Sequence, residues 1–405
     1  MDNSQIVEIT DAREFGSEVQ VIEVSDCTVM PGVIDAHVHL AAWAQWLISQ
    51  QHQSLMYLAA RTISAMRQTL EHGITTVRDL GGLESGFVRA QENGLLVGPR
   101  LQSSVVIIQA ANGITDNIPG MGGTTSPQGL SLTVPGMPLP YVSGPWAGRQ
   151  KVREALRAGA DVIKIATTSL SLKGVPQREL ATLTSEEIEA IVDEAHSAGV
   201  MVTCHAGGGP GVLRAVKAGV DTIEHGNVLD EETAEEMARR GTWLVPMFWI
   251  LNFHATTAPT EERRARYRLI SGVAIDAFQL ARRRGVRIAM GSDSGEHGIG
   301  GSMVEMQLMV TAGMSPAEAI VASTLRASEC LQIDDRVGTL EPGKEADLLV
   351  INGNPLQDIS VLQHPEHIEL ILQGGRPVGG TRLANPLARL AANTGGAPGP
   401  VLALV

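Results

Sequence analysis

VMPGVIDAHVH, residues 29–39, is the stretch that decides the fold. Its apolar run predicts a buried strand, and His37 and His39 lie two positions apart at the end of that run. Residues i and i+2 of a strand point to the same side, so both imidazoles are expected to face the same region. Imidazole nitrogens gathered on one side of a strand suit a divalent metal ion.

Comparable apolar runs recur along the chain and alternate with helix-like stretches. One such stretch has the spacing of a capping box at Thr184 and Glu187, followed by an apolar face that includes Ile188 and Ile191. Strands that alternate with helices imply parallel pairing with right-handed crossovers. The expected strands are Val33–His39, Thr75–Asp79, Leu101–Ile108, Asp161–Ala166, Met201–His205, Thr222–His225, Trp243–Phe248 and Arg287–Asp293. These units predict an α/β protein with a closed (β/α)8 TIM barrel.

The two ends of the chain have a different pattern, with short β-type runs separated by Gly and Pro turns. We expect residues 1–30 and 330–382 to form one small composite β-sandwich domain and residues 31–329 to form the barrel. Residues 383–405 are rich in Ala, Gly and Pro and predict a tail without a role in a core. Residues 110–148 predict a long loop over the C-terminal face of the barrel, either an ordered lid or a solvated insertion.

The composition of the 405 residues narrows the class of protein. Hydrophobic residues make up 43%, enough for a large core, while the formal net charge of −13 argues against nucleic acid and anionic membranes as partners. The three widely spaced cysteines predict neither a disulfide framework nor a CxxC metal site. Residues 1–20 lack the pattern of a leader peptide, and no apolar run approaches about 18 residues. We therefore expect a cytoplasmic protein that acts on a small molecule.

Four more polar side chains lie at or near the ends of expected strands. Lys164 stands in the apolar run 162–165, where a charged amine is costly. Burial lowers the pKa of an amine, and the neutral amine can react with carbon dioxide to give an anionic carbamate ligand. The other interpretation is a lysine that extends from the strand end to water. His205, His225 and Asp293 end the fifth, sixth and eighth expected strands.

A closed barrel brings the carboxyl ends of its strands into one crater. We therefore interpret six residues as a single metal-binding constellation: His37, His39, Lys164, His205, His225 and Asp293.

The pattern resembles the amidohydrolase superfamily, specifically its binuclear members with a carboxylated lysine. It is close to the subgroup of imidazolonepropionase-related proteins and metal-dependent prolidases. The matching stretches are PGVIDAHVHL at 31–40, GITTVRDLGG at 73–82, VDTIEHG at 220–226 and GTLEPGKEADL at 338–348.

The resemblance implies a metal-dependent hydrolase of carbon–nitrogen bonds with two divalent ions, for which we expect zinc. It implies that His37, His39 and Asp293 bind one ion and that His205 and His225 bind the other. A carbamate on Lys164 and a hydroxide would bridge the two ions. That hydroxide would attack the substrate, with Asp293 as the proton shuttle. The resemblance also implies a homo-oligomer.

The loops around the constellation depart from the peptidase relatives. Residues 111–116 read ANGITD, without the histidine expected there, and residues 165–169 read IATTS in place of a Met-Ala-Thr-Gly-Gly run. We therefore expect an N-acyl amino acid, a dipeptide, or an apolar aryl amide or carbamate as the substrate. The candidate substrate contacts, which share a place after expected strands, are Trp43, Trp46, Trp146, Trp249, His254 and His297.

Other functions use the same fold. A mononuclear deaminase or cyclic-amidine hydrolase is one alternative, but such enzymes usually place no bridging lysine on the fourth strand. A lactone or ester hydrolase is another, because the same hydroxide attacks those centres. A non-catalytic barrel would have lost ligands, and all six candidate ligands are present.

Overall fold

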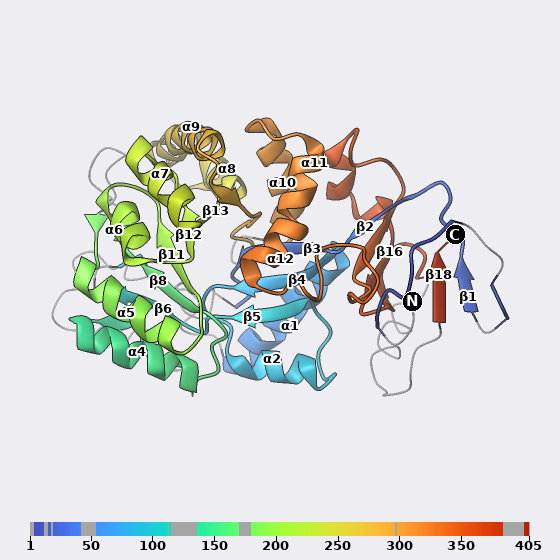
Figure 1. The fold of residues 1–405 in the computed structure, drawn as a ribbon, viewed down its shortest axis with the longest axis horizontal. Helices are drawn as coiled ribbons and strands as arrows, with labels where there is room; N and C mark the ends of the chain where they lie inside the picture. Colours follow the sequence, from blue (N-terminus) through green and yellow to red (C-terminus); the bar gives the residue numbers. More distant parts are fainter. Residues whose placement is uncertain are drawn as a thin grey trace.

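The structure is a computed structural model that describes residues 4–11, 15–17, 19–41, 54–111, 113–114, 136–169, 180–295, 298–383 and 401–404. Figure 1 shows a large body of helices around strands, with a smaller group of strands beside it where both chain ends lie. Among the described residues, no helix is long and apolar enough to cross a membrane.

The large body is built on parallel strands that follow one another in chain order. Each strand pairs with the next one, apart from a break within the third unit. The strands are β3 (Val33–Val38), β4 (Ile74–Asp79), β5 (Arg100–Ser103), β6 (Ile107–Ala110), β8 (Ile163–Ala166), β11 (Val202–Ala206), β12 (Thr222–His225), β13 (Trp243–Val245) and β14 (Arg287–Ile288). A two-residue strand, β7 (Tyr141–Val142), pairs with β6.

The third expected strand, Leu101–Ile108, is two strands. Val105 has a positive φ of 63°, which a β-branched residue rarely adopts, and this bend separates β5 from β6. β5 pairs with β4, whereas β6 pairs with β8. The third unit therefore connects β4 to β8, with β5 on one side of the bend and β6 on the other.

Backbone hydrogen bonds connect the last strand of this series back to the first. The amide of Ala36 donates to the carbonyl of Met290 at 2.9 Å, and the amide of Asp293 donates to the carbonyl of His37 at 2.8 Å. The expected strand Arg287–Asp293 pairs with β13 only at β14. Beyond it, the amide of Met290 donates to the carbonyl of Ala322, and the amide of Asp293 donates to that of His37. The predicted (β/α)8 fold is confirmed.

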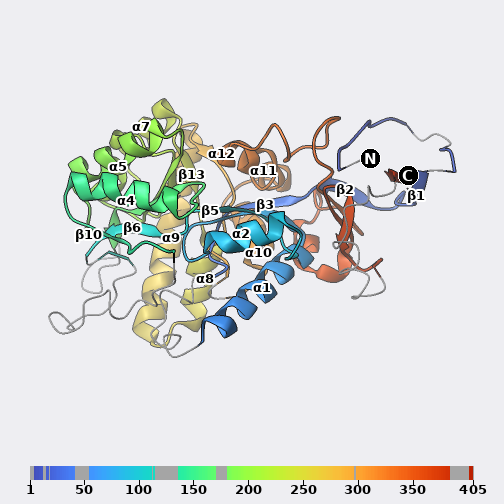
Figure 2. The ribbon, with the colours of Figure 1, turned by 90° about the horizontal axis from the view of Figure 1, so that it is seen from below.

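Helices cover the outside of the strands (Figures 1 and 2). They are α1 (Leu55–Glu71), α2 (Ser85–Glu92), α4 (Pro145–Arg157), α5 (Ser185–Ser197), α6 (Pro210–Ala218), α7 (Glu231–Arg240), α8 (Phe248–Thr257), α9 (Glu261–Arg283), α10 (Gly301–Thr311), α11 (Pro316–Ala322) and α12 (Leu325–Leu331). α5 begins with the predicted capping box of Thr184 and Glu187 and buries Ile188 and Ile191. Phe248, expected in the seventh strand, instead begins α8.

The smaller group of strands is built from both ends of the chain. β2 (Thr28–Pro31) pairs antiparallel with β15 (Leu348–Ile351), and β16 (Ile368–Gln373) and β17 (Arg376–Gly379) complete that sheet. Two short 3-10 helices, η3 (Ile359–Gln363) and η4 (Pro365–His367), connect β15 to β16. A hairpin of β9 (Thr168–Ser169) and β10 (Leu180–Ala181) lies in the barrel region.

The end of the chain differs from the expectation of a tail without a role in a core. β1 (Val19–Ile22) pairs parallel with β18 (Val401–Leu404), and Leu404 packs against a small core that contains Leu348 and Leu370. The Ala, Gly and Pro content of the tail did not indicate this pairing, for which the four apolar residues 401–404 suffice. Residues 384–400 lie outside the described residues.

Candidate active site

The six residues predicted as ligands lie in or after five strands of the barrel. His37 is in β3 and His39 follows it, Lys164 is in β8, and His205 is in β11. The other two members, His225 and Asp293, end β12 and follow β14. Lys164 stands two residues before Ala166, whose register partner in β11 is His205. Lys164 therefore lies two residues deeper in the barrel than His205.

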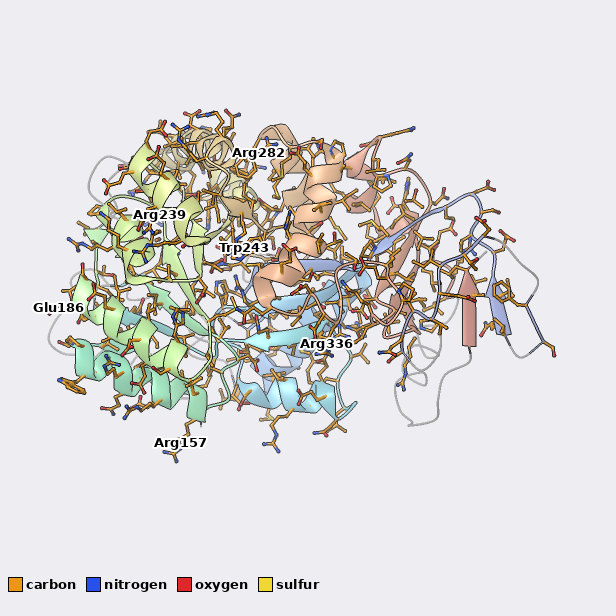
Figure 3. All side chains as sticks on the ribbon, viewed as in Figure 1. Arg157, Glu186, Arg239, Trp243, Arg282 and Arg336 are labelled. Carbon is orange, nitrogen blue, oxygen red and sulfur yellow. The ribbon has the colours of Figure 1, made fainter. Side chains whose placement is uncertain are left out.

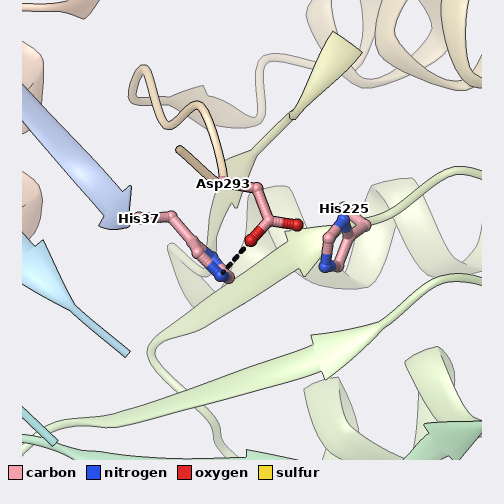
Figure 4. A group of neighbouring side chains, drawn as sticks. All are labelled: His37, His225 and Asp293. Atoms are coloured by element: carbon pink, nitrogen blue, oxygen red, sulfur yellow. Dashed lines mark ion pairs between the residues drawn. The ribbon is translucent and has the colours of Figure 1, made fainter. Parts of the chain in front are cut away.

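Nitrogen and oxygen atoms of these side chains converge. His37 Nε2 lies 3.2 Å from His39 Nε2, and Asp293 Oδ1 lies 3.3 Å from His39 Nε2 and 3.7 Å from His37 Nε2. Each of His37, His225 and Asp293 offers a ligand atom within 4.8 Å of the others (Figure 4). The His205 and His225 rings are 4.4 Å apart between centroids. The arrangement suits a cation, because four imidazoles and a carboxylate lie close to one another.

Two buried nitrogens of the cluster support a site for a bound group. Lys164 Nζ and His205 Nε2 have no hydrogen-bond partner among the described residues. A buried polar atom without a partner is costly, and in native proteins it usually has an explanation such as an ion or a modification. A cation at the imidazoles and a carbamate on the lysine would satisfy both atoms, so the donor set fits the implied metal centre.

Burial also sets the protonation of the cluster. It lowers the pKa of His37 and His205 well below the usual value and lowers the pKa of His225 to about 3, and the nearby Lys164 charge acts in the same direction. Burial lowers the pKa of Lys164 to about 8, although the Glu224 carboxylate opposes this shift. Neutral imidazoles bind metals, and a neutral amine is the form that reacts with carbon dioxide.

A buried network orients His37. Its Nδ1 lies 2.6 Å from a Glu224 oxygen, and Arg78 donates from Nη2 to the other Glu224 oxygen at 3.0 Å. Arg78 also donates from Nε to the carbonyl of Ala36 at 2.8 Å, and Thr222 donates its hydroxyl to Glu224. A carboxylate on one ring nitrogen directs the other nitrogen to the cluster, as around many metal-binding histidines.

Glu224 and Arg78 were not among the functional residues predicted from the sequence. The signal was present, since each is a charged residue inside an apolar strand, as Lys164 is. Their opposite charges could have indicated a buried pair across the barrel.

A model of the amidohydrolase family matches residues 28–378 of the chain. The chain belongs to the amidohydrolase family. Ochratoxinase from Aspergillus niger is 30% identical over 364 residues, which cover 86% of this chain and 75% of that protein. Imidazolonepropionase from Geobacillus thermodenitrificans is 24% identical over 398 residues, with 89% and 83% covered. A prolidase crystallised with N-methylphosphonate-L-proline superimposes with a TM-score of 0.83 at 31% identity and 93% coverage of each chain.

Membership of the amidohydrolase family confirms the predicted superfamily and subgroup. It also confirms that the chain is a hydrolase that acts on carbon–nitrogen bonds of the amide type.

Asp35 ties the first strand of this amidohydrolase to the segment that carries Asp293. One oxygen of Asp35 accepts from the amides of His37 at 2.9 Å and Ser292 at 3.1 Å. The other oxygen accepts from the hydroxyls of Ser292 at 2.5 Å and Ser302 at 2.7 Å. Burial raises the pKa of Asp35 to about 6, against the effect of these hydrogen bonds.

Two candidate ligands of the amidohydrolase have left-handed backbone. φ is 73° at His225 and 60° at Asp293. Consecutive residues of a strand normally point to opposite sides, yet Glu224 contacts His37 and the adjacent His225 belongs to the same cluster. The turn at His225 explains this, and such conformations concentrate at functional sites.

The candidate substrate contacts occupy different surroundings. Trp249 is half-buried at the start of α8, and His254 is half-buried on the same helix with its ring stacked on Tyr267 at 4.6 Å. Trp146 is 82% exposed in the first turn of α4, so it is not among the buried side chains of the cluster. His297, Trp43, Trp46 and most of the 110–148 loop lie outside the described residues.

Proposed function

We propose that this chain hydrolyses an amide-type bond of a small molecule with two divalent metal ions, which we expect to be zinc. His37, His39 and Asp293 would hold one ion and His205 and His225 the other, with carboxylated Lys164 shared between them. The observation that carries the proposal is the buried Lys164 Nζ, which has no hydrogen-bond partner among the described residues and lies beside the histidine cluster.

The chemistry that divalent ions supply at such a site is Lewis acidity towards a carbonyl oxygen and acidification of a water molecule. The exposure of Asp293 supports a role in moving the proton. Its side chain is 17% exposed while His37 beside it is buried, so its carboxylate can reach a bound substrate. We propose that Asp293 accepts the proton of the attacking water and delivers it to the departing amine.

The proposed substrate is an N-acyl amino acid, a dipeptide, or an apolar aryl amide or carbamate. Two relatives support this range, since one is an ochratoxinase and another is a prolidase crystallised with a proline phosphonate. The half-buried Trp249 would supply an apolar wall, and His254 would add a polar edge further along α8. A hydrolysis screen of these classes against ureas, lactones and esters tests the range.

The metal content of the purified protein tests the proposed centre. Protein prepared without chelators should contain about two divalent ions per chain and should lose its amide hydrolysis when they are removed. Mass spectrometry of the metals in dialysed protein is the measurement. A content near one ion per chain would overturn the binuclear centre in favour of the mononuclear alternative, and amide hydrolysis that survives metal removal would overturn both.

Lys164→Ala tests the bridging carbamate. The variant should lose about 100-fold or more in kcat/KM, because several kcal/mol of transition-state stabilisation depend on the bridged pair of ions. Short carboxylic acids should restore part of the activity by occupying the vacated position. Lys217→Ala is the matched control, since Lys217 is an exposed lysine on α6 that pairs with Glu232. Full activity of Lys164→Ala without added acid would contradict the bridging role.

A further inference from the structure

The first turns of α10 contact two parts of the site. Ser302 donates its hydroxyl to Asp35 at 2.7 Å, and Asp35 in turn holds Ser292, which precedes Asp293. Glu305 lies on the same helix and is fully buried, with 0% exposure. Its two oxygens accept from the amides of Phe248 at 3.0 Å and Trp249 at 2.6 Å. α10 therefore joins the segment of Asp293 to the start of α8.

The start of α8 depends on Glu305 because the helix has no cap of its own. Met247 occupies the N-cap position and makes no side-chain hydrogen bond to the helix. The first amides of a helix need partners from outside it, and a carboxylate is favoured there by the helix dipole. Burial raises the pKa of Glu305 well above its usual value, with a smaller contribution from Asp35 and Asp293, while the two amides oppose that shift.

Gly301 explains how close Trp249 comes to the Asp293 segment. A Cβ atom on Gly301 would lie 2.6 Å from Cδ2 of the Trp249 ring and 2.3 Å from Oγ of Ser294, the residue after Asp293. Both atoms therefore pack directly on the α10 backbone, where no side chain fits. The indole stands next to the segment that carries the proposed proton shuttle.

We propose that Glu305 is a positioning residue that holds Trp249 as the apolar wall of the substrate pocket, and that it thereby determines the preference for a bulky apolar group beside the scissile bond. The inference rests on the proposed function. Glu305 accepts from the amides of Phe248 and Trp249, so it acts through the backbone of α8.

Glu305→Gln isolates this role with little change in volume. The amide side chain offers one oxygen and one NH₂ group, so it satisfies one of the two backbone amides and sets a donor against the other. We compare it with Trp249→Ala, with the double variant, and with Glu262→Gln, an exposed glutamate on α9. The substrates are N-acetyl-L-phenylalanine and N-acetyl-L-alanine, which differ only in the bulky group.

Glu305→Gln should raise KM for the phenylalanine compound by about 10-fold and leave kcat and the alanine compound within about 2-fold. In the Trp249→Ala background it should add nothing, because its effect passes through that ring. Metal content should equal that of wild type. Equal losses for both substrates, or additive effects in the double variant, would overturn the proposal.

The fluorescence of Trp249 gives a readout that is independent of activity. The chain has five tryptophans, so the spectrum of Trp249 is the difference between wild type and Trp249→Ala. This difference should shift when Glu305→Gln is present, and an unchanged difference would overturn the link between the two residues. An absence of hydrolysis or metal in wild type would instead overturn the proposed function.

Gly301→Ala keeps the test decisive if Glu305→Gln does not fold. The added methyl group would meet both the indole and Oγ of Ser294 without altering the carboxylate of Glu305. The alanine compound reports any effect that passes through Ser294 to Asp293, because such an effect would change the hydrolysis of both substrates. The same loss of preference for the phenylalanine compound is expected. An unchanged preference in this variant, with metal content retained, would count against a positioning role of α10.

Discussion

The Glu224 carboxylate connects His37 to the buried guanidinium of Arg78. The carboxylate contacts His37 Nδ1 at 2.6 Å and accepts a hydrogen bond from Arg78 at 3.0 Å. The side chains of Glu224 and Arg78 are fully buried. A pair in such surroundings contributes less to stability than its charges suggest, because desolvation offsets the attraction. Its value here is the orientation of one imidazole, whose Nε2 is left for the cluster.

Glu224→Gln should weaken metal binding by about 10- to 100-fold, because the amide no longer holds the His37 ring by a charged acceptor. Competition with a chelating dye measures the dissociation constant. Excess metal should restore much of the activity. Glu186→Gln, at an exposed glutamate on α5 (Figure 3), is the control and should bind metal as wild type does. Unchanged metal affinity in Glu224→Gln would contradict the orienting role.

At the level of residues, the sequence predicted what depends on strand position. Each candidate ligand could be assigned to a strand end, and the barrel brings those ends together. The roles of Glu224 and Glu305 depend on contacts between residues far apart in the chain, and no local pattern indicates such contacts. Trp146, which also follows an expected strand, is 82% exposed, and its contact with substrate stays a prediction.

At the level of elements, the existence of strands was easier to predict than their ends. One strand was expected over Leu101–Ile108, but the positive φ of Val105 breaks the ladder there. Another was expected over Arg287–Asp293, but only Arg287 and Ile288 pair with β13. A strand ends where the neighbouring strand offers no further hydrogen-bond partners. The hydrophobicity of the sequence does not show where that point lies. The capping box of α5 is local, and it was predicted correctly.

Asp79 links two of these strand ends and gives a pH-dependent prediction. It ends β4 and accepts from the amide of Leu40, after β3, at 2.7 Å and from the amide of Gly81 at 3.1 Å. Burial raises the pKa of Asp79 to about 7. The folded state therefore holds a proton that the unfolded chain has already released.

The stability of wild type relative to Asp79→Asn should thus fall as the pH rises from about 4 and should level off above about 7. The contribution of Asp79 is complete below the unfolded pKa and is lost as the pH passes through the folded pKa. Urea unfolding of both proteins at several pH values measures the difference. A difference that grows with pH, or that stays constant, would show that Asp79 is ionised in the folded state.

At the scale of the whole molecule, Arg100 joins the barrel to the small sheet. It lies in β5 and donates to Asp347 at 2.7 Å and to Glu345, both just before β15. Burial alone would lower the pKa of Arg100, but the two carboxylates raise it. Asp347 also accepts from the amide of Gly374 after β16 at 2.7 Å, so one cluster connects three elements.

Arg100→Ala should lower the free energy of unfolding by about 2 kcal/mol, because the two carboxylates lose a charged donor in a largely buried place. Thermal and urea unfolding measure the change, and metal content should not alter. Arg157→Ala is the control, since Arg157 is exposed and points away from the molecule on α4 (Figure 3). Equal stability of the two variants would mean that Arg100 does not join the two parts.

The bond between Asp35 and Ser292 spans 257 positions of the chain and bears on how the enzyme is made. A ribosome that adds about 5 to 20 residues per second needs roughly 13 to 50 s to make that span. During this time His37 and His39 have been synthesised, whereas Asp293 and the segment that closes the ring on β3 have not. A nascent chain therefore exposes the unpaired edge of β3 and an incomplete set of ligands until translation is well advanced.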